Sequence, residues 1–171
     1  MCEGIRLVEV PAMDALKCLE LHHLRREVLS SCSHGRVVIE FADGVPLTDL
    51  NDARRMADGM IALVNLPMLG PHWFPIDRAR AAKILTEVLH WDLETLSAMV
   101  PEHEAKLLTE TILDQFEGDV TYLTNVRPTA DLAQSPHRWA SGSERIELDA
   151  GVAIIGSDLV GLLWVEDRPP R

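Results

Sequence analysis

The chain has 171 residues, of which 47% are hydrophobic and 25% charged, and its formal net charge at pH 7 is −11. A domain of this length buries roughly 70% of its unfolded surface, so we expect one globular domain over residues 1–171, with 167–171 as a frayed tail. The acidic balance without a basic stripe argues against nucleic-acid binding, and no apolar run reaches the about 20 residues that a membrane span requires.

The first part of the chain predicts a strand, a helix and a second strand. Residues 5–10 are β-rich and stop before Pro11, which predicts a strand. From residue 12 the apolar spacing becomes helical, with one face formed by Leu16, Leu19, Leu24 and Val28. A short β-branched run at 37–41, followed by the turn-forming pair Asp43 and Gly44, predicts the next strand.

A second helix and an apolar loop follow. Thr48 is the predicted N-cap of this helix and Pro67 ends it, and its apolar stripe consists of Leu50, Ala53, Met56, Met60 and Val64. Residues 65–75 contain three prolines and a glycine, which predicts a loop, and this loop carries the aromatic pair Trp73 and Phe74.

Two more helices are predicted before the spacing of the apolar residues changes from that of a helix to that of a strand. Asp77 caps the third helix, whose apolar arc consists of Ala81, Ile84, Leu85, Val88 and Leu89. Pro101 suits the first turn of a fourth helix that ends near Gly118, with Glu102 and Glu104 well placed against its N-terminal dipole. The buried stripe of this fourth helix is predicted to be Ala105, Leu108, Ile112 and Phe116.

The remainder of the chain predicts sheet. Residues 120–126 alternate with period 2, 128–144 form a long connection, and 146–165 are largely apolar with a turn at 156–158. Continuous apolarity indicates hairpin strands that are covered on both faces and central in their sheet. We therefore expect an α+β fold with about four helices in the first two-thirds, packed on a mainly antiparallel sheet that ends in a C-terminal β-hairpin.

No motif in the sequence identifies a chemistry. A dinucleotide-binding loop, a P-loop, a nucleophile elbow and an EF-hand loop are all absent, so no cofactor and no catalytic residue are expected. His103 and Glu104 begin a zinc-protease motif, but Leu107 stands where its second histidine is required. No familiar zinc spacing is matched by Cys18, His22, Cys32 and His34. We expect reduced thiols, no metal and a cytoplasmic location.

Three histidines lie beside tryptophans, in the pairs His72 and Trp73, His90 and Trp91, and His137 and Trp139. One interpretation makes the protein an enzyme or small-molecule binder, with the loop at Trp73 as a lid over a pocket that His72 or His90 lines. The opposing interpretation is that each tryptophan anchors its segment in the core while its neighbour faces water, because adjacent residues point to different faces.

The strongest feature of the sequence is a local excess of acid. Residues 84–126 hold nine acidic side chains and one basic one, Lys106, and so supply −8 of the net charge. On a helical wheel Glu110, Asp114 and Glu117 form a ridge opposite the predicted core stripe. Like charges at i, i+4 and carboxylates in a last turn are both unfavourable, and Lys106 is the only cation nearby in sequence. An uncompensated feature of this kind points to function, although a merely solvated helix face is the competing explanation.

These observations favour a binding protein rather than an enzyme. The expected class is an immunity protein or antitoxin, a toxin inhibitor that neutralises a basic partner such as a nuclease-type toxin by occluding it. Arginine outnumbers lysine 13 to 3, which suits a GC-rich bacterial genome. The predicted partner-binding residues are Glu94, His103, Leu107, Glu110, Asp114, Glu117 and Asp119. A third possibility is a homo-oligomer in which the C-terminal hairpin extends a sheet across subunits.

Overall fold

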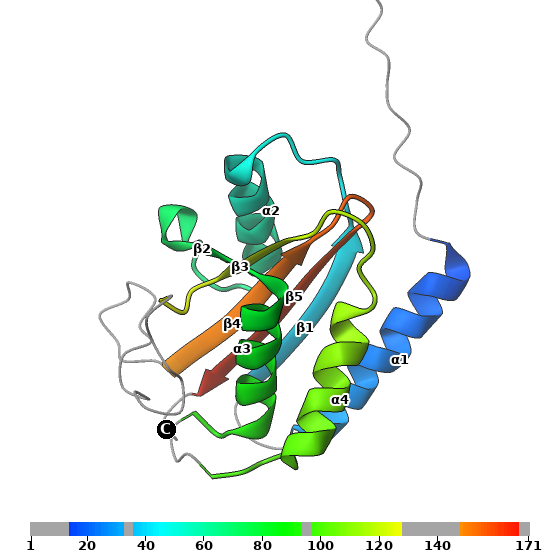
Figure 1. Ribbon diagram of the computed structural model, residues 1–171, viewed down its shortest axis with the longest axis vertical. Coiled ribbons are helices and arrows are strands. Elements are labelled where there is room, and N and C mark those ends of the chain that lie inside the picture. The colour runs from blue at the N-terminus through cyan, green and yellow to red at the C-terminus, as the bar shows by residue number, and fades with distance from the viewer. Residues whose placement is uncertain (1–13, 33–35, 94–96, 128–147, 168–171) are drawn as a thin grey trace, which may run out of the picture.

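The computed structural model describes residues 14–32, 36–93, 97–127 and 148–167 (Figure 1). In chain order the elements are α1 (Ala15–Ser31), β1 (Arg36–Asp43), α2 (Leu50–Leu63), the 3-10 helix η1 (Gly70–His72), β2 (Phe74–Ile76), α3 (Arg78–His90), α4 (Glu102–Leu113), β3 (Thr121–Thr124), β4 (Leu148–Ile155) and β5 (Leu159–Asp167). The predicted α+β architecture is confirmed. The strand predicted at 5–10 and the connection predicted at 128–144 lie outside the described residues.

The five described strands form one sheet in the order β1-β5-β4-β3-β2, and every neighbouring pair is antiparallel. The hairpin strands β4 and β5 pair from Leu148 opposite Asp167 to Ile155 opposite Val160. Both lie away from the edges of the sheet, as their continuous apolarity predicted. The possibility that this hairpin extends a sheet across subunits is therefore wrong, because neither of its strands has a free edge.

Each face of the sheet is covered by a helical layer, with α1, α3 and α4 on one side and α2 on the other (Figure 1). Alternate residues of β5 serve the two cores. The core under α2 receives Val160, Leu162 and Trp164, whereas the core under α1, α3 and α4 receives Leu159, Leu163 and Val165. A strand that is buried on both faces has no need of polar residues, which explains the apolar run in the sequence.

Helix α1 departs from its predicted apolar face. Its buried residues are Leu21, Leu24 and Val28, whereas Leu16 and Leu19 are 67% and 52% exposed. No residue of α1 before Leu21 is buried, so the first turns of the helix extend past the core. Only the second half of the predicted stripe is confirmed.

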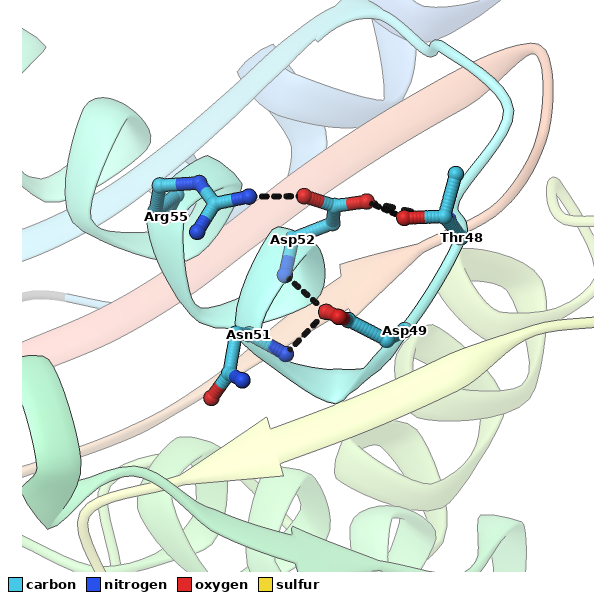
Figure 2. A network of polar contacts seen from close by, with 5 residues as sticks. All are labelled: Thr48, Asp49, Asn51, Asp52 and Arg55. Carbon is cyan, nitrogen blue, oxygen red and sulfur yellow. Dashed lines mark hydrogen bonds and ion pairs between the residues drawn. The ribbon is translucent and has the colours of Figure 1, made fainter.

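Helix α2 begins one residue later than predicted, because Asp49 and not Thr48 is its N-cap (Figure 2). The Asp49 carboxylate accepts hydrogen bonds from the backbone N–H groups of Asn51 and Asp52 at 2.7 and 2.9 Å. The Asp52 carboxylate in turn accepts from the hydroxyl and the N–H of Thr48 and pairs with Arg55. These hydrogen bonds from Thr48 lower the pKa of Asp52 below its ordinary range. The cluster is a reciprocal helix cap.

The shift moves Leu50 out of the predicted stripe of α2. As the first helical residue it is 38% exposed, and the buried face of the helix consists of Ala53, Ala57, Met60 and Ile61. Val64, at the C-cap, is buried as predicted.

The segment predicted as a loop at 65–75 contains η1 and the short edge strand β2. The carboxylate of Asp58, on α2, fixes this segment. It accepts hydrogen bonds from the N–H groups of Leu69 and Gly70 at 2.9 and 3.1 Å and from the indole N–H of Trp73 at 2.9 Å. Trp73 is fully buried. These hydrogen bonds and the buried indole attach the segment to α2.

Candidate partner-binding surface

The inner face of α4 is built as its sequence predicts. Pro101 is the N-cap, Glu102 and Glu104 occupy the first turn, and the predicted stripe of Ala105, Leu108, Ile112 and Phe116 is buried. Phe116 lies beyond the helix and still packs in the same core. Because the inner face is anchored in this way, the orientation of the outer face is determined.

The outer face of α4 presents the predicted partner-binding residues to solvent. Leu107 is 68% exposed, and the side chains of His103, Glu110 and Asp114 are 84%, 51% and 70% exposed. These four residues follow one line along the helix at i, i+4, i+7 and i+11. The remaining predicted residues are Glu117 and Asp119, which are exposed in the connection from α4 to β3, and Glu94, which lies outside the described residues.

The helix ends earlier than predicted, and this changes the reading of the acidic ridge. The last helical residue is Leu113, and Asp114 is the C-cap residue. Glu117 is therefore outside the helix, and its predicted place in a last helical turn was wrong. The ridge therefore consists of a helical residue, a cap residue and a loop residue, all of them exposed.

Two of the three acids of the ridge are compensated, contrary to the prediction from sequence. The guanidinium of Arg78, in the first turn of α3, lies 3.1 Å from Oε2 of Glu110 and 2.8 Å from Oδ1 of Asp114. Arg78 also hydrogen-bonds the hydroxyl of Tyr122, whose pKa is raised by burial and drawn partly back by this cation. The two carboxylates thus have a shared partner from a neighbouring helix.

A second cation supports the end of α4. The ammonium group of Lys17, on α1, donates to the backbone carbonyl of Gln115 at 3.2 Å and to its side-chain Oε1 at 3.1 Å. A positive charge beside the C-terminal end of a helix is favourable to the helix dipole.

The first turns of α4 hold an ion pair of their own. The ammonium group of Lys106 pairs with the Glu102 carboxylate at 2.6 Å and lowers the pKa of that carboxyl group. Within the described residues, Glu117 and Asp119 have no cationic partner.

Sequence reasoning missed Arg78 and Lys17 because both act across tertiary contacts. Arg78 is 32 and 36 residues from its two acidic partners, and Lys17 is 98 residues from Gln115. The one available signal was the antiparallel packing expected of two consecutive helices, which brings the start of α3 beside the end of α4 (Figure 1).

The structure describes two of the three histidines weighed as pocket residues. His72 is exposed beside buried Trp73, which matches the interpretation that this tryptophan anchors its segment. Nδ1 of His90 lies 2.5 Å from the carbonyl of Val100 and so carries the proton, and its ring contacts that of Trp91 in a tilted arrangement, with centroids 4.2 Å apart. His137 lies outside the described residues.

Among the described residues, no group of three or more His, Cys, Asp or Glu side chains could hold a metal ion. Burial raises the pKa of the Cys32 thiol to about 11, which makes it unreactive at neutral pH. None of the described helices combines the length and the apolarity that crossing a bilayer requires.

Comparison with models of protein families, with curated proteins and with solved structures finds no match to this chain.

Proposed function

We propose that this protein is an acidic binding protein of the immunity or antitoxin type, which occludes a basic partner protein through the outer face of α4. The observation that carries the proposal is Leu107, a leucine 68% exposed between two ion-paired positions of an acidic helix. Interfaces gain most of their affinity from a few fully desolvated side chains, which lie within a ring of less important contacts. Leu107 and the carboxylates around it fit that arrangement.

The ion pairs of Arg78 contribute to the proposed interface by holding its acids in place. Glu110 and Asp114 each contact Arg78 through one oxygen, and these contacts leave the second carboxylate oxygen of each residue for a cation of the partner. A side chain that is already ordered loses less entropy on binding. The acidic excess of residues 84–126 would in addition steer a basic partner toward this side of the molecule.

An acidic surface of this kind can stand in for phosphates, which makes a nuclease-type toxin the partner class that fits best. Such an inhibitor acts by blocking a surface and needs neither catalytic residues nor a cofactor. The proposal therefore requires nothing of the protein beyond the surface of α4 and the residues that order it.

The test compares two equally exposed apolar residues. The variants Leu107→Asp and Met68→Asp replace side chains that are 68% and 69% exposed, on α4 and in the loop after α2 respectively. Each tagged protein is used to capture partners from the native host, and captured proteins are then purified and tested for direct binding. We expect a basic partner that Met68→Asp retains and Leu107→Asp loses. A partner that both variants bind equally would refute the proposed surface.

A further inference from the structure

The first turns of α1 leave two leucines in solvent near the acidic end of α4. Leu16 and Leu19 are 67% and 52% exposed. Lys17, between them in sequence, donates from its ammonium group to the backbone carbonyl of Gln115 at 3.2 Å. Because Gln115 directly follows Asp114, this contact brings the start of α1 to the level of the acidic ridge.

The ion pair of Arg25 shows which flank of α1 faces α4. Its guanidinium lies 2.6 Å from the carboxylate of Glu40, which is on the face of the sheet that α2 covers, so Arg25 reaches it around the outer edge of β1. Helix α4 lies on the other side of α1, between α1 and α3 (Figure 1). At about 100° per residue, Leu16, Glu20 and Glu27 lie opposite Arg25 and therefore toward α4.

Helix α4 forms the other wall of this surface. The hydrogen bonds from α1 to Gln115 show that the flank of α4 in line with Gln115 faces α1. Glu104 and Thr111 share that flank, and Leu107 adjoins it one turn before Thr111. The two-helix surface formed by these facing flanks holds two leucines and three glutamates, all of them exposed: Leu16, Glu20, Glu27, Glu104 and Leu107.

We propose that the two-helix surface receives an amphipathic helix of the basic partner, with basic residues along its flanks, which rests on the proposed function and extends its surface from α4 to α1. Leu107 is eight residues before Gln115, about 12 Å along the helix, and Leu16 lies near the level of Gln115. Two apolar residues two turns apart on a docked helix have about the same separation. Helices that bind grooves use anchors with this kind of spacing.

Charge complementarity selects a basic helix from outside the chain. Among the described residues, no ion pair involves Glu20 or Glu27, so both carboxylates are left for a partner. A second copy would bring a net charge of −11 against these acids. Residues 1–13 hold two glutamates and one arginine, and residues 128–147 hold three acids and two arginines, so the side chains of each segment sum to −1. A basic helix therefore complements the surface better than any of these occupants.

The test uses the purified basic partner that the variant Met68→Asp captures, with its dissociation constant measured by titration calorimetry. Leu16→Ser and Glu20→Lys should each weaken binding roughly tenfold or more, because the first removes an apolar anchor and the second puts like charges together. Leu63→Ser is the matched control, at a leucine of α2 that is 70% exposed, and should not change the affinity.

Hydrogen exchange gives a second readout, which needs no substitution. The amides of residues 15–20, in the turns of α1 before its first buried residue, should exchange more slowly in the complex than in the free chain. In the partner, a helix rich in lysine or arginine should become protected at the same time. Circular dichroism establishes that each variant is folded.

The possible failures are distinguishable. If Leu107→Asp loses the partner while Leu16→Ser and Glu20→Lys bind it normally, the role of α1 is overturned and the proposed function stands. If Leu107→Asp also binds normally, or no basic partner is captured, the proposed function fails and the docked helix with it. Binding that strengthens when residues 1–13 are deleted, or a free chain whose dimerisation Leu16→Ser abolishes, would show a different occupant and overturn the proposal.

Discussion

The two faces of α4 use the same helix for different purposes. On the inner face Ala105 is fully buried and Ile112 is 1% exposed, and both belong to the core beneath α1, α3 and α4. On the outer face Leu107 is 68% exposed and Glu110 pairs with Arg78. Burial makes the inner residues sensitive to any polar change, whereas solvent screens the outer ones. Stability and recognition should therefore be separable on this helix by substitution.

The largest expected effect is on the inner face. Ile112→Asp buries an unpaired charge and should destabilise the domain by about 3–5 kcal/mol, a large share of the stability of a typical domain. Leu107→Asp, an identical replacement type on the outer face, should change the free energy of unfolding by less than about 0.5 kcal/mol. Chemical denaturation followed by circular dichroism measures both. Similar losses of unfolding free energy in the two variants would mean that substitutions on the two faces of α4 cannot separate stability from recognition.

A second comparison is between the carboxylate of Asp58, which is partly buried, and that of Asp114, which is exposed. Asp58→Ala removes the acceptor for the indole N–H of Trp73 and for two backbone N–H groups, and should cost about 2–3 kcal/mol. Asp114→Ala, which loses an exposed ion pair, should cost less than about 1 kcal/mol. Denaturation midpoints followed by tryptophan fluorescence give the comparison, and equal costs would contradict the assigned role of Asp58.

The sequence predicted the parts of the fold that follow from periodicity. The buried arc of α3 and the stripe of α4 match in every residue, and the hairpin of β4 and β5 is central in the sheet. In these elements burial dictates the spacing of apolar residues, so the pattern can be read directly.

The features that sequence did not predict depend on contacts between distant elements. Arg78 and Lys17 compensate the end of α4 from two other helices, so the lack of compensation expected for Glu110 and Asp114 came from considering one helix alone. Leu16 and Leu19 are periodic but extend past the core, which periodicity cannot detect. The exposed position of Glu110 was predicted because it follows from the inner stripe of the same helix.

A smaller effect should separate two roles on the outer face of α4: the acidic charge itself, and the ion pairs with Arg78 that order the acidic side chains. Reversing Glu110, Asp114 and Glu117 to lysine removes both contacts of Arg78 but favours the helix dipole, so we expect a net loss of about 1 kcal/mol or less. Binding of a basic partner should weaken more than roughly tenfold. Arg78→Gln should cost similar stability and weaken binding less than the reversal does, because the acidic charge remains although its side chains are less ordered. For both variants, titration calorimetry measures binding of the partner and chemical denaturation measures the free energy of unfolding.

The smallest effect is kinetic and separates Leu107 from the acids beside it. If the carboxylates steer a basic partner, its association should slow between low and physiological ionic strength, since exposed charges are screened beyond about 8 Å at 0.15 M salt. Leu107→Ala should leave that salt dependence unchanged and raise the dissociation rate, because an apolar anchor acts after contact is made. Stopped-flow measurements with the captured partner give both rates. An association rate that is flat across the salt range would remove steering from the mechanism, and an unchanged dissociation rate would remove Leu107 as the anchor.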